Sequence, residues 1–280
     1  MEYEYEKDIV PYVIKADQLI KTMIFNMSPL YKKEHGEGQN VTVPLFTTLH
    51  STSESILILL LHRGIFDADV LLRTVMEGTI KYCYLMTGTF ETRKERHREY
   101  HLDLAQIEKL DDHKKAIESV EILKEFSNNN TKPFEANILS EEEYDILSAI
   151  YTKQKRNDLK RKWGYSALLR ELAKDNKEYE AQLGSLSTYA LSSHFCHFDW
   201  TGVSSRIAPS LSSEEDSELL DFGHALRIIS NVLSCYLFRV AEYIRGNSFS
   251  SAAVSVIALE AYDFIKEIDE SQNKIVEGNI

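Results

Sequence analysis

An apolar segment of the sequence carries an arginine and a glutamate at a spacing suited to pairing. Arg73 and Glu77 lie four residues apart within DADVLLRTVMEGTIKYCYL. Side chains at this spacing are neighbours on one face of a helix and form ion pairs. Burying such a pair is costly unless further polar groups satisfy both ions. The pair therefore predicts an internal polar cavity with a ligand or catalytic partner, and the alternatives are a structural clamp between helices or an ordinary surface pair.

A second segment, residues 189–200 (YALSSHFCHFDW), gathers several reactive side chains at the end of an expected helix. Its histidines have a near-neutral pKa, which suits a general acid or base or an anion-binding group. The structural alternative is that Tyr189 and His197 are buried and hydrogen-bonded there. We also considered zinc, but the spacing matches no established zinc motif, so we expect no metal and no cofactor. The zinc ligands considered are His194, Cys196, His197, Asp199 and His224.

A third segment carries an arginine and a histidine on a strongly charged stretch. Arg96 and His101 stand in RHREYH, and this spacing is similar to that of HEPN ribonucleases. In such a site the histidine takes a proton from a ribose 2′-hydroxyl while the arginine stabilises charge on the phosphate, and no metal is needed. Roughly one match of this kind is expected by chance in a chain of this composition. The alternative is a solvated helix face.

Composition limits the classes of function and fold. The chain has 32 Lys and Arg against 44 Asp and Glu, a net charge of −12, which argues against a broad surface for long nucleic acids. Only 11 Gly and 5 Pro occur in 280 residues, too few for a fold rich in hairpins. The three cysteines are far apart, as in proteins of a reducing compartment. The N-terminus does not resemble a signal peptide, and the longest apolar run is Ile56–Leu61. We therefore expect a cytoplasmic protein without a membrane span.

Apolar residues recur at three- and four-residue steps along most of the chain, which indicates helices. We predict an all-α, bundle-like single domain over residues 1–280 with eight or nine helices and a candidate sub-boundary at the linker 127–139. Gly64 and Gly88 are expected to end two of the helices, and Ser140 with Glu143 forms a capping box. The predicted helices are 9–27, 44–63, 66–86, 91–126 with a bend near 111–112, 140–154, 165–173, 178–194, 217–244 and 249–268. The segments expected to be irregular or solvated are 31–40, 127–133, 153–162 and 196–211.

Two of these segments together resemble a bacterial family of all-helical proteins whose function is unknown. The resemblance rests on Arg73-x-x-x-Glu77, on Tyr189-Ala-Leu-Ser-Ser193 followed by His197, and on Trp163 before a short helix. It covers about residues 45–200. Ser192 stands one residue too far from His197, so Ser193 takes the place of the serine of the family pattern. The resemblance implies an all-helical fold in which the ligand-binding residues Arg73, Glu77, Tyr189, Ser193 and His197 converge on one polar site.

Two functions follow as expectations. The first is a metal-independent, HEPN-like endoribonuclease or toxin-type effector used in stress or phage defence, with Arg96 and His101 as catalytic residues, RNA as substrate and a homodimer as the working form. The basic cluster between Arg93 and Arg98 would hold a short substrate. The second is a non-catalytic sensor or scaffold that binds a small polar ligand or a protein partner.

Overall fold

The computed structural model describes residues 4–32, 39–126, 130–174, 176–207, 211 and 213–276. All regular secondary structure within these ranges is helical, so the predicted all-α fold is confirmed, with more helices than the eight or nine expected. The chain forms two compact units. The first unit combines Met1–Thr87 with Leu169–Ile280, and the second is Gly88–Leu168. The linker 127–139 lies inside the second unit.

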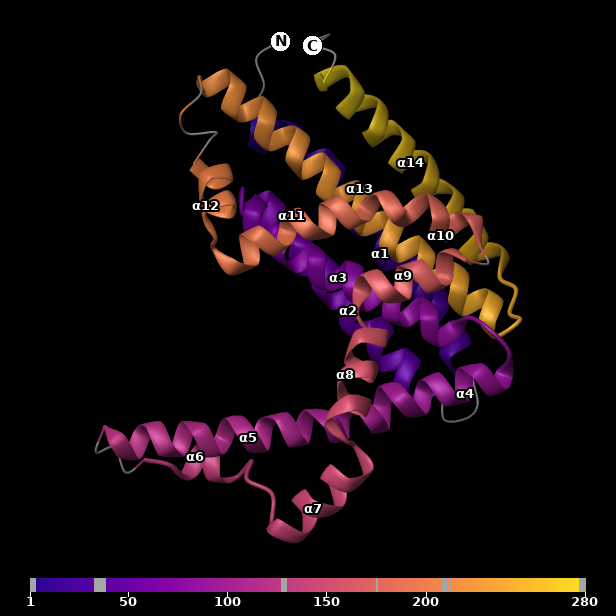
Figure 1. Cartoon of the computed structure of the whole chain (residues 1–280). Helices are drawn as coiled ribbons and strands as arrows, with labels where there is room; N and C mark the ends of the chain where they lie inside the picture. The colour runs from indigo at the N-terminus through magenta and orange to yellow at the C-terminus, as the bar shows by residue number, and fades with distance from the viewer. Residues whose placement is uncertain are drawn as a thin grey trace. The chain divides into compact units, whose positions relative to one another are not determined.

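The first unit is a bundle built around α3. Here α3 packs against α2, α11 and α13, while α13 also packs against α1 and α14 (Figure 1). Its helices are α1 (Tyr5–Tyr31), α2 (Gln39–Leu61), α3 (Ile65–Met86), α10 (Lys177–Ala181), a 3-10 turn (Gln182–Gly184), α11 (Ser185–His197), α12 (Trp200–Ile207), α13 (Glu214–Gly246) and α14 (Ala252–Val276), with α9 (Tyr165–Ala173) crossing the boundary between the units.

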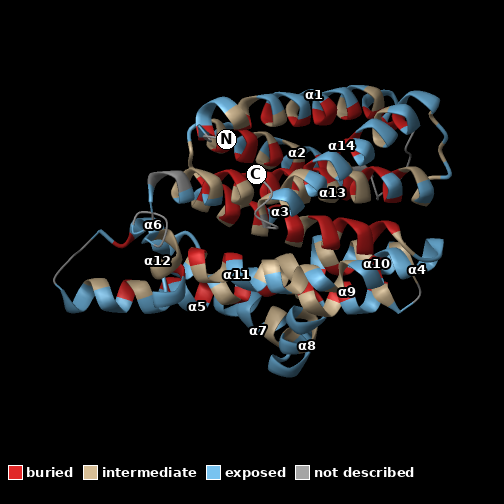
Figure 2. Cartoon of the chain, turned by 90° about the horizontal axis from the view of Figure 1, so that it is seen from above, coloured by how far each residue is buried: buried red, intermediate tan, exposed pale blue. Residues whose placement is uncertain are grey.

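The core of the first unit explains why α3 is so apolar. Its side chains are buried on most sides, including Leu72, Val75 and Leu85, because neighbouring helices cover them (Figure 2). Burying a side chain of this size stabilises the fold by about 1.5–3 kcal/mol. Residues 40–61 of α2 are long and apolar enough to cross a membrane by length and composition alone, and α2 packs against α1 and α3.

The end of α2 differs from the predicted glycine cap. Arg63 has the left-handed conformation, with φ of 56°, whereas φ of Gly64 is −78°. The amide of Gly64 donates to the carbonyl of Leu59 at 2.8 Å and that of Arg63 to Leu60 at 3.2 Å, as in a Schellman motif. The arginine is held there by ion pairs with Glu218 and Asp221 of α13. The prediction that Gly64 is the left-handed residue at the end of α2 was therefore wrong. Gly88 does follow the end of α3 as predicted, with φ of 94°.

The second unit contains the long charged helix, which is interrupted where the sequence did not indicate it. A π-helical turn at Glu99–Asp103 separates α4 (Phe90–Arg98) from α5 (Leu104–Glu125), so the bend expected near 111–112 was misplaced. In a π turn the hydrogen bonds run from residue i to i+5. Arg98 and Asp103, five residues apart, form an ion pair at 3.2 Å across this turn.

Buried polar contacts hold the π turn to the rest of the second unit. Glu99 accepts hydrogen bonds from Lys162 and from Trp163 Nε1, and Asp103 accepts one from Tyr151 at 2.8 Å. Next to them is a small apolar cluster. Its members are Ile107, Leu110, Tyr151, Leu139, Leu147 and Leu159.

The remaining elements of the second unit are short helices. They are α6 (Lys132–Glu135), α7 (Glu141–Ile150) and α8 (Lys153–Lys162). The capping box of Ser140 and Glu143 is confirmed at the start of α7. The segment 153–162, expected to be solvated, is a helix without buried residues. The segment 196–211 was expected to be irregular, but its residues 200–207 are helical. Parts of the expected loops 31–40 and 127–133 lie outside the described residues.

Candidate anion-binding site

The charged residues of α3 form a ladder along one side of the helix. Asp69, Arg73, Glu77 and Lys81 are each four residues apart, so each side chain neighbours the next. Acidic and basic groups alternate along the ladder. The helices α11 and α13 pack against α3 and supply polar partners for the ladder.

At one end of the ladder is a buried cluster that we call the Asp69 cluster, formed by Asp69, Ser192, His224 and Arg227. Asp69 has no solvent exposure. Its Oδ1 accepts a hydrogen bond from Ser192 Oγ at 2.8 Å. Its Oδ2 lies 2.9 Å from His224 Nε2 and 2.7 Å from Arg227 Nη2. One carboxylate therefore joins α11 and α13 to α3.

The electrostatics of the cluster keep Asp69 ionised. Burial alone raises the pKa of Asp69, but the hydrogen bond from His224 and the charge of Arg227 outweigh burial and hold the pKa below its ordinary value. Because the carboxylate accepts from Nε2 of His224, neutral His224 carries its lone pair on Nδ1.

Two nitrogen atoms of the Asp69 cluster have no hydrogen-bond partner within the described residues. His224 Nδ1 is one, and the His224 side chain is 19% exposed. Nη1 of Arg227 is the other, and it is enclosed. A buried donor without an acceptor costs about 1–3 kcal/mol. An acceptor from outside the chain would remove this cost.

The rest of the ladder forms a hydrogen-bonded chain through Tyr189 of α11. The Tyr189 hydroxyl accepts from Arg73 Nη2 at 3.0 Å and donates to Glu77 Oε2 at 3.0 Å. The guanidinium of Arg73 also lies 4.4 Å from the Tyr189 ring centroid. Lys81 donates to Glu77 Oε1 at 2.7 Å. Burial raises the pKa of Glu77, but Lys81 and Tyr189 more than offset this effect and the pKa is lowered.

The structure brings together three of the five predicted ligand-binding residues: Arg73, Glu77 and Tyr189. Ser193 is half-buried and His197 is exposed. Within the described part of the chain, neither of them hydrogen-bonds to the other three. His197 points away because the side of α11 that faces α3 carries Tyr189 and Ser192.

Three other residues of the segment 189–200, His194, Phe198 and Asp199, form the turn between α11 and α12. Phe198 has the left-handed conformation, with φ of 49°. Asp199 Oδ1 accepts the amide of Gly202 at the start of α12, and His194 Nδ1 lies 2.6 Å from Asp199 Oδ2. The hydrogen bond with His194 lowers the pKa of Asp199. Among the described residues, no group of three or more His, Cys, Asp or Glu side chains is placed to hold a metal ion.

The predicted catalytic pair lies in the second unit, at the interrupted helix. Arg96 is half-buried on α4, and His101 is exposed within the π turn. A groove of about 410 Å³ lies beside the π turn, between residues of the turn and α8. Arg98, Glu99 and Asp103 line this groove, whereas Arg96 and His101 do not.

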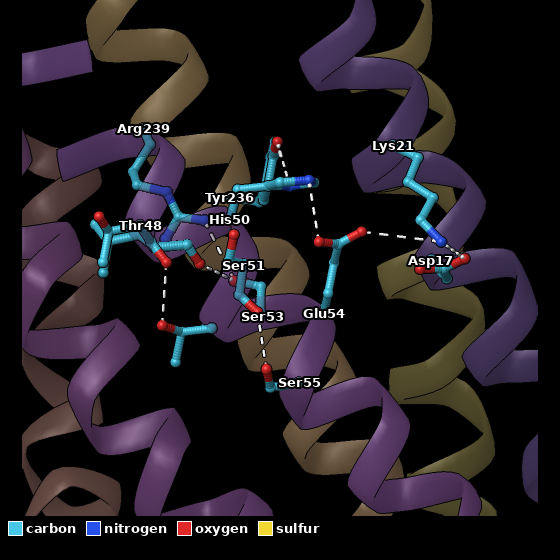
Figure 3. A network of polar contacts seen from close by, with 12 residues as sticks. Asp17, Lys21, Thr48, His50, Ser51, Ser53, Glu54, Ser55, Tyr236 and Arg239 are labelled. Atoms are coloured by element: carbon cyan, nitrogen blue, oxygen red, sulfur yellow. Dashed lines mark hydrogen bonds and ion pairs between the residues drawn. The ribbon is translucent and has the colours of Figure 1, made fainter. Parts of the chain in front are cut away.

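A further polar network crosses the first unit around Arg239 of α13. The Arg239 side chain has no solvent exposure, donates to Thr79 at 2.7 Å and to Ser53 at 3.5 Å, and lies 4.9 Å from the Tyr236 ring centroid. No carboxylate of the described residues pairs with it. Figure 3 shows the connected chain that runs from Tyr236 through His50 and Glu54 to Lys21 and Asp17 on α1. These contacts join α13 to α2 and α1, so we interpret the network as structural.

The sequence reasoning missed both Asp69 and Arg227. Extending the four-residue spacing of Arg73 and Glu77 by one step in each direction would have found Asp69 and Lys81. No local pattern indicates His224 and Arg227, because they lie 155 and 158 residues from Asp69.

The chain matches a known protein family over more than half of its length. A family model described as a family of unknown function, DUF5677, matches residues 39–216. The chain belongs to the DUF5677 family. The DUF5677 match includes α3 and α11, with Asp69, Arg73, Tyr189 and Ser192, and it ends near the start of α13. No curated protein and no solved structure matches the chain.

Proposed function

We propose that this DUF5677 protein binds a small anionic ligand, with a phosphate or carboxylate group, beside the Asp69 cluster. The observation that carries the proposal is the unused donor Nη1 of Arg227, which lies on α13 three residues after His224. Arg227 Nη1 lacks an acceptor, and an anionic oxygen is the strongest acceptor for a guanidinium.

The charges around the site favour an anion. Within the ladder and the Asp69 cluster, Arg73, Lys81 and Arg227 supply three positive charges, whereas Asp69 and Glu77 supply two negative charges. The ladder and the Asp69 cluster thus carry one more positive than negative side chain. A guanidinium presents a planar set of donors that matches the oxygens of phosphate or carboxylate.

A binding experiment tests the proposal with defined probes. Inorganic phosphate, a nucleoside monophosphate and citrate are titrated by calorimetry into the wild type and into Arg227→Lys, which keeps the charge beside Asp69 but loses the planar donors. We expect at least one probe to bind the wild type and to bind Arg227→Lys at least about tenfold more weakly. Arg245→Lys makes the same change on α13 at a half-exposed arginine and serves as the control. Equal binding by the two variants, or no binding of any probe to the wild type, would refute the proposal.

A second candidate function is metal-independent RNA cleavage by a homodimer, with Arg96 as the phosphate-stabilising group and His101 as the base. The observation in its favour is the π turn, because single π turns within α-helices are frequent at functional sites. The test is incubation with total RNA in EDTA. Loss of cleavage in His101→Ala but not in His62→Ala, an exposed histidine of the first unit, supports it. No cleavage by the wild type, or equal cleavage by all three proteins, excludes it.

A further inference from the structure

The first unit has a groove between α1 and α14 that the proposed anion site does not use. The groove has a volume of about 610 Å³. Figure 2 shows exposed residues along α1 and α14. Apolar side chains and three carboxylates of α14 line most of the groove. The lining residues used below are Lys15, Leu19, Ile257, Glu260, Asp263, Phe264 and Glu267.

The groove already binds one ammonium group of the chain itself. Lys15 Nζ lies 4.1 Å from the ring centroid of Phe264 and 2.8 Å from Glu267 Oε2. An ammonium over an aromatic face and beside a carboxylate is a favourable arrangement. The same two kinds of contact, with an aromatic ring and with a carboxylate, would bind a lysine or arginine of another molecule.

Two further carboxylates of the groove are not neutralised in this way. Glu260 forms no ion pair within the described residues. Asp263 pairs with Lys266, its neighbour on α14, at 3.7 Å, where both side chains are more than half exposed. Exposed pairs of this kind contribute little, about 0–1 kcal/mol. The groove thus has an excess of negative charge.

Exposed apolar side chains also occur on both helices that form the groove, although they do not line it. On α14, Val256 is 52% exposed and Leu259 is 64% exposed, and each lies one turn before a groove carboxylate. On α1, Ile14 is 48% exposed, one turn before Gln18 of the groove wall, and Phe25 is 77% exposed. Contiguous exposed apolar surface often marks an interaction site.

We propose that the groove between α1 and α14 is a docking surface for an amphipathic, basic helix of a partner protein. The apolar face of the helix would lie on Ile257 and on the exposed Val256 and Leu259. Its flanking lysines or arginines would pair with Glu260 and Asp263. Helix-in-groove recognition uses apolar anchors at i, i+3, i+4 and i+7 in this way. A small organic cation would satisfy the carboxylates but would leave the apolar side chains beyond them uncovered, which favours a helix.

The test uses a synthetic helical peptide with leucines at i, i+3, i+4 and i+7 and lysines beside them, labelled with a fluorophore and titrated with the full chain. A peptide of the same composition in scrambled order, and spermine, are the comparison ligands. Glu260→Lys/Asp263→Lys is expected to bind the amphipathic peptide at least about tenfold more weakly. The matched control, Glu118→Lys/Glu121→Lys on α5, makes the same change in net charge and is expected to bind as the wild type does.

The outcomes separate docking from general attraction to an acidic protein. Weaker binding confined to the groove variant, with preference for the amphipathic over the scrambled peptide, supports the proposal. Equal weakening in both charge variants, no preference between the peptides, displacement of the peptide by spermine at equal concentration, or no binding would overturn it. The anion probes above are independent of this groove, so either proposal can fail alone.

Discussion

The carboxylate of Asp69 accepts hydrogen bonds from α11 and α13 while it is closed off from solvent. An aspartate in this position is stable only because its partners compensate for lost hydration. The four-residue spacing on α3 is visible in the sequence and identified Arg73 and Glu77. The structure connects these two residues through the Tyr189 hydroxyl and not by the direct ion pair that the spacing predicted. The partners on α13 depend on tertiary packing and have no local signal. Sequence reasoning therefore identified the middle of the ladder and missed its buried end.

Replacement of Asp69 by asparagine is expected to destabilise the first unit strongly. The change leaves the charge of Arg227 without its carboxylate, and removal of one partner of a buried pair costs about 3–5 kcal/mol. Urea unfolding followed by circular dichroism gives the loss. Asp67→Asn is the control, because Asp67 is 66% exposed and pairs with Arg206 at the surface, where about 0–1 kcal/mol is expected. Equal losses of unfolding free energy in the two variants would show that the contacts of Asp69 do not hold α3, α11 and α13 together.

The same residue predicts a dependence of stability on pH. The pKa of Asp69 is lower in the folded chain than its ordinary value of 3.8. The unfolded chain therefore takes up the proton first as pH falls, so the contribution of Asp69 is complete above about pH 5 and is lost as pH falls below about 4. We expect the difference in unfolding free energy between wild type and Asp69→Asn to be constant from about pH 5 to 7 and to shrink below about pH 4. A difference that grows on acidification would contradict the assignment.

Helix ends are the elements that sequence periodicity located least well. The α2–α3 junction was expected at Gly64, because glycine is the usual residue for a left-handed conformation. The chain uses Arg63 instead, since ion pairs with Glu218 and Asp221 hold it there. Likewise, the segment after α11 was expected to be irregular, although Asp199 caps α12 through Gly202. The π turn has no sequence pattern that distinguishes it from a continuous helix.

The Arg63→Gly variant tests which effect dominates at the end of α2. Glycine removes the cost of a left-handed arginine, about 1–2 kcal/mol. It also removes two charged hydrogen bonds to half-buried carboxylates, each worth about 1.5–3 kcal/mol. We therefore expect a net loss of about 1–5 kcal/mol in urea unfolding. The Arg63→Asn variant should lose a similar amount, because asparagine accepts the same backbone conformation without the charge. A stabilised glycine variant would mean that the ion pairs contribute less than the left-handed arginine costs.

At the scale of the whole molecule, each compact unit has its own buried residues and its own tryptophan. Trp163 is buried in the second unit and Trp200 is exposed in the first. The second unit is the smaller of the two, and small units bury a smaller fraction of their surface. The all-α class was predictable because helical periodicity runs through nearly the whole chain. The division into two units was not, because both boundaries, near Gly88 and Leu168, depend on which helices pack together.

The second unit is expected to unfold at a lower urea concentration than the first. In Trp200→Phe the remaining Trp163 reports the second unit, and its emission should shift to longer wavelength before most of the helical signal in circular dichroism is lost. Trp200 is 78% exposed, so its replacement should cost less than about 0.5 kcal/mol. Coincident transitions by fluorescence and circular dichroism would show instead that the two units unfold together.

The order of synthesis matters for a unit assembled from two separated stretches of chain. The ribosome releases α3 long before α13, because His224 and Arg227 follow Asp69 by 155 and 158 residues. The stretch Gly88–Leu168 is continuous and emerges complete in between. The second unit is therefore fully synthesised before the first unit is. The helices α1, α2 and α3 keep part of their apolar surface exposed until α13 has been synthesised, when translation is nearly over. Such a chain is most exposed to aggregation during its own synthesis.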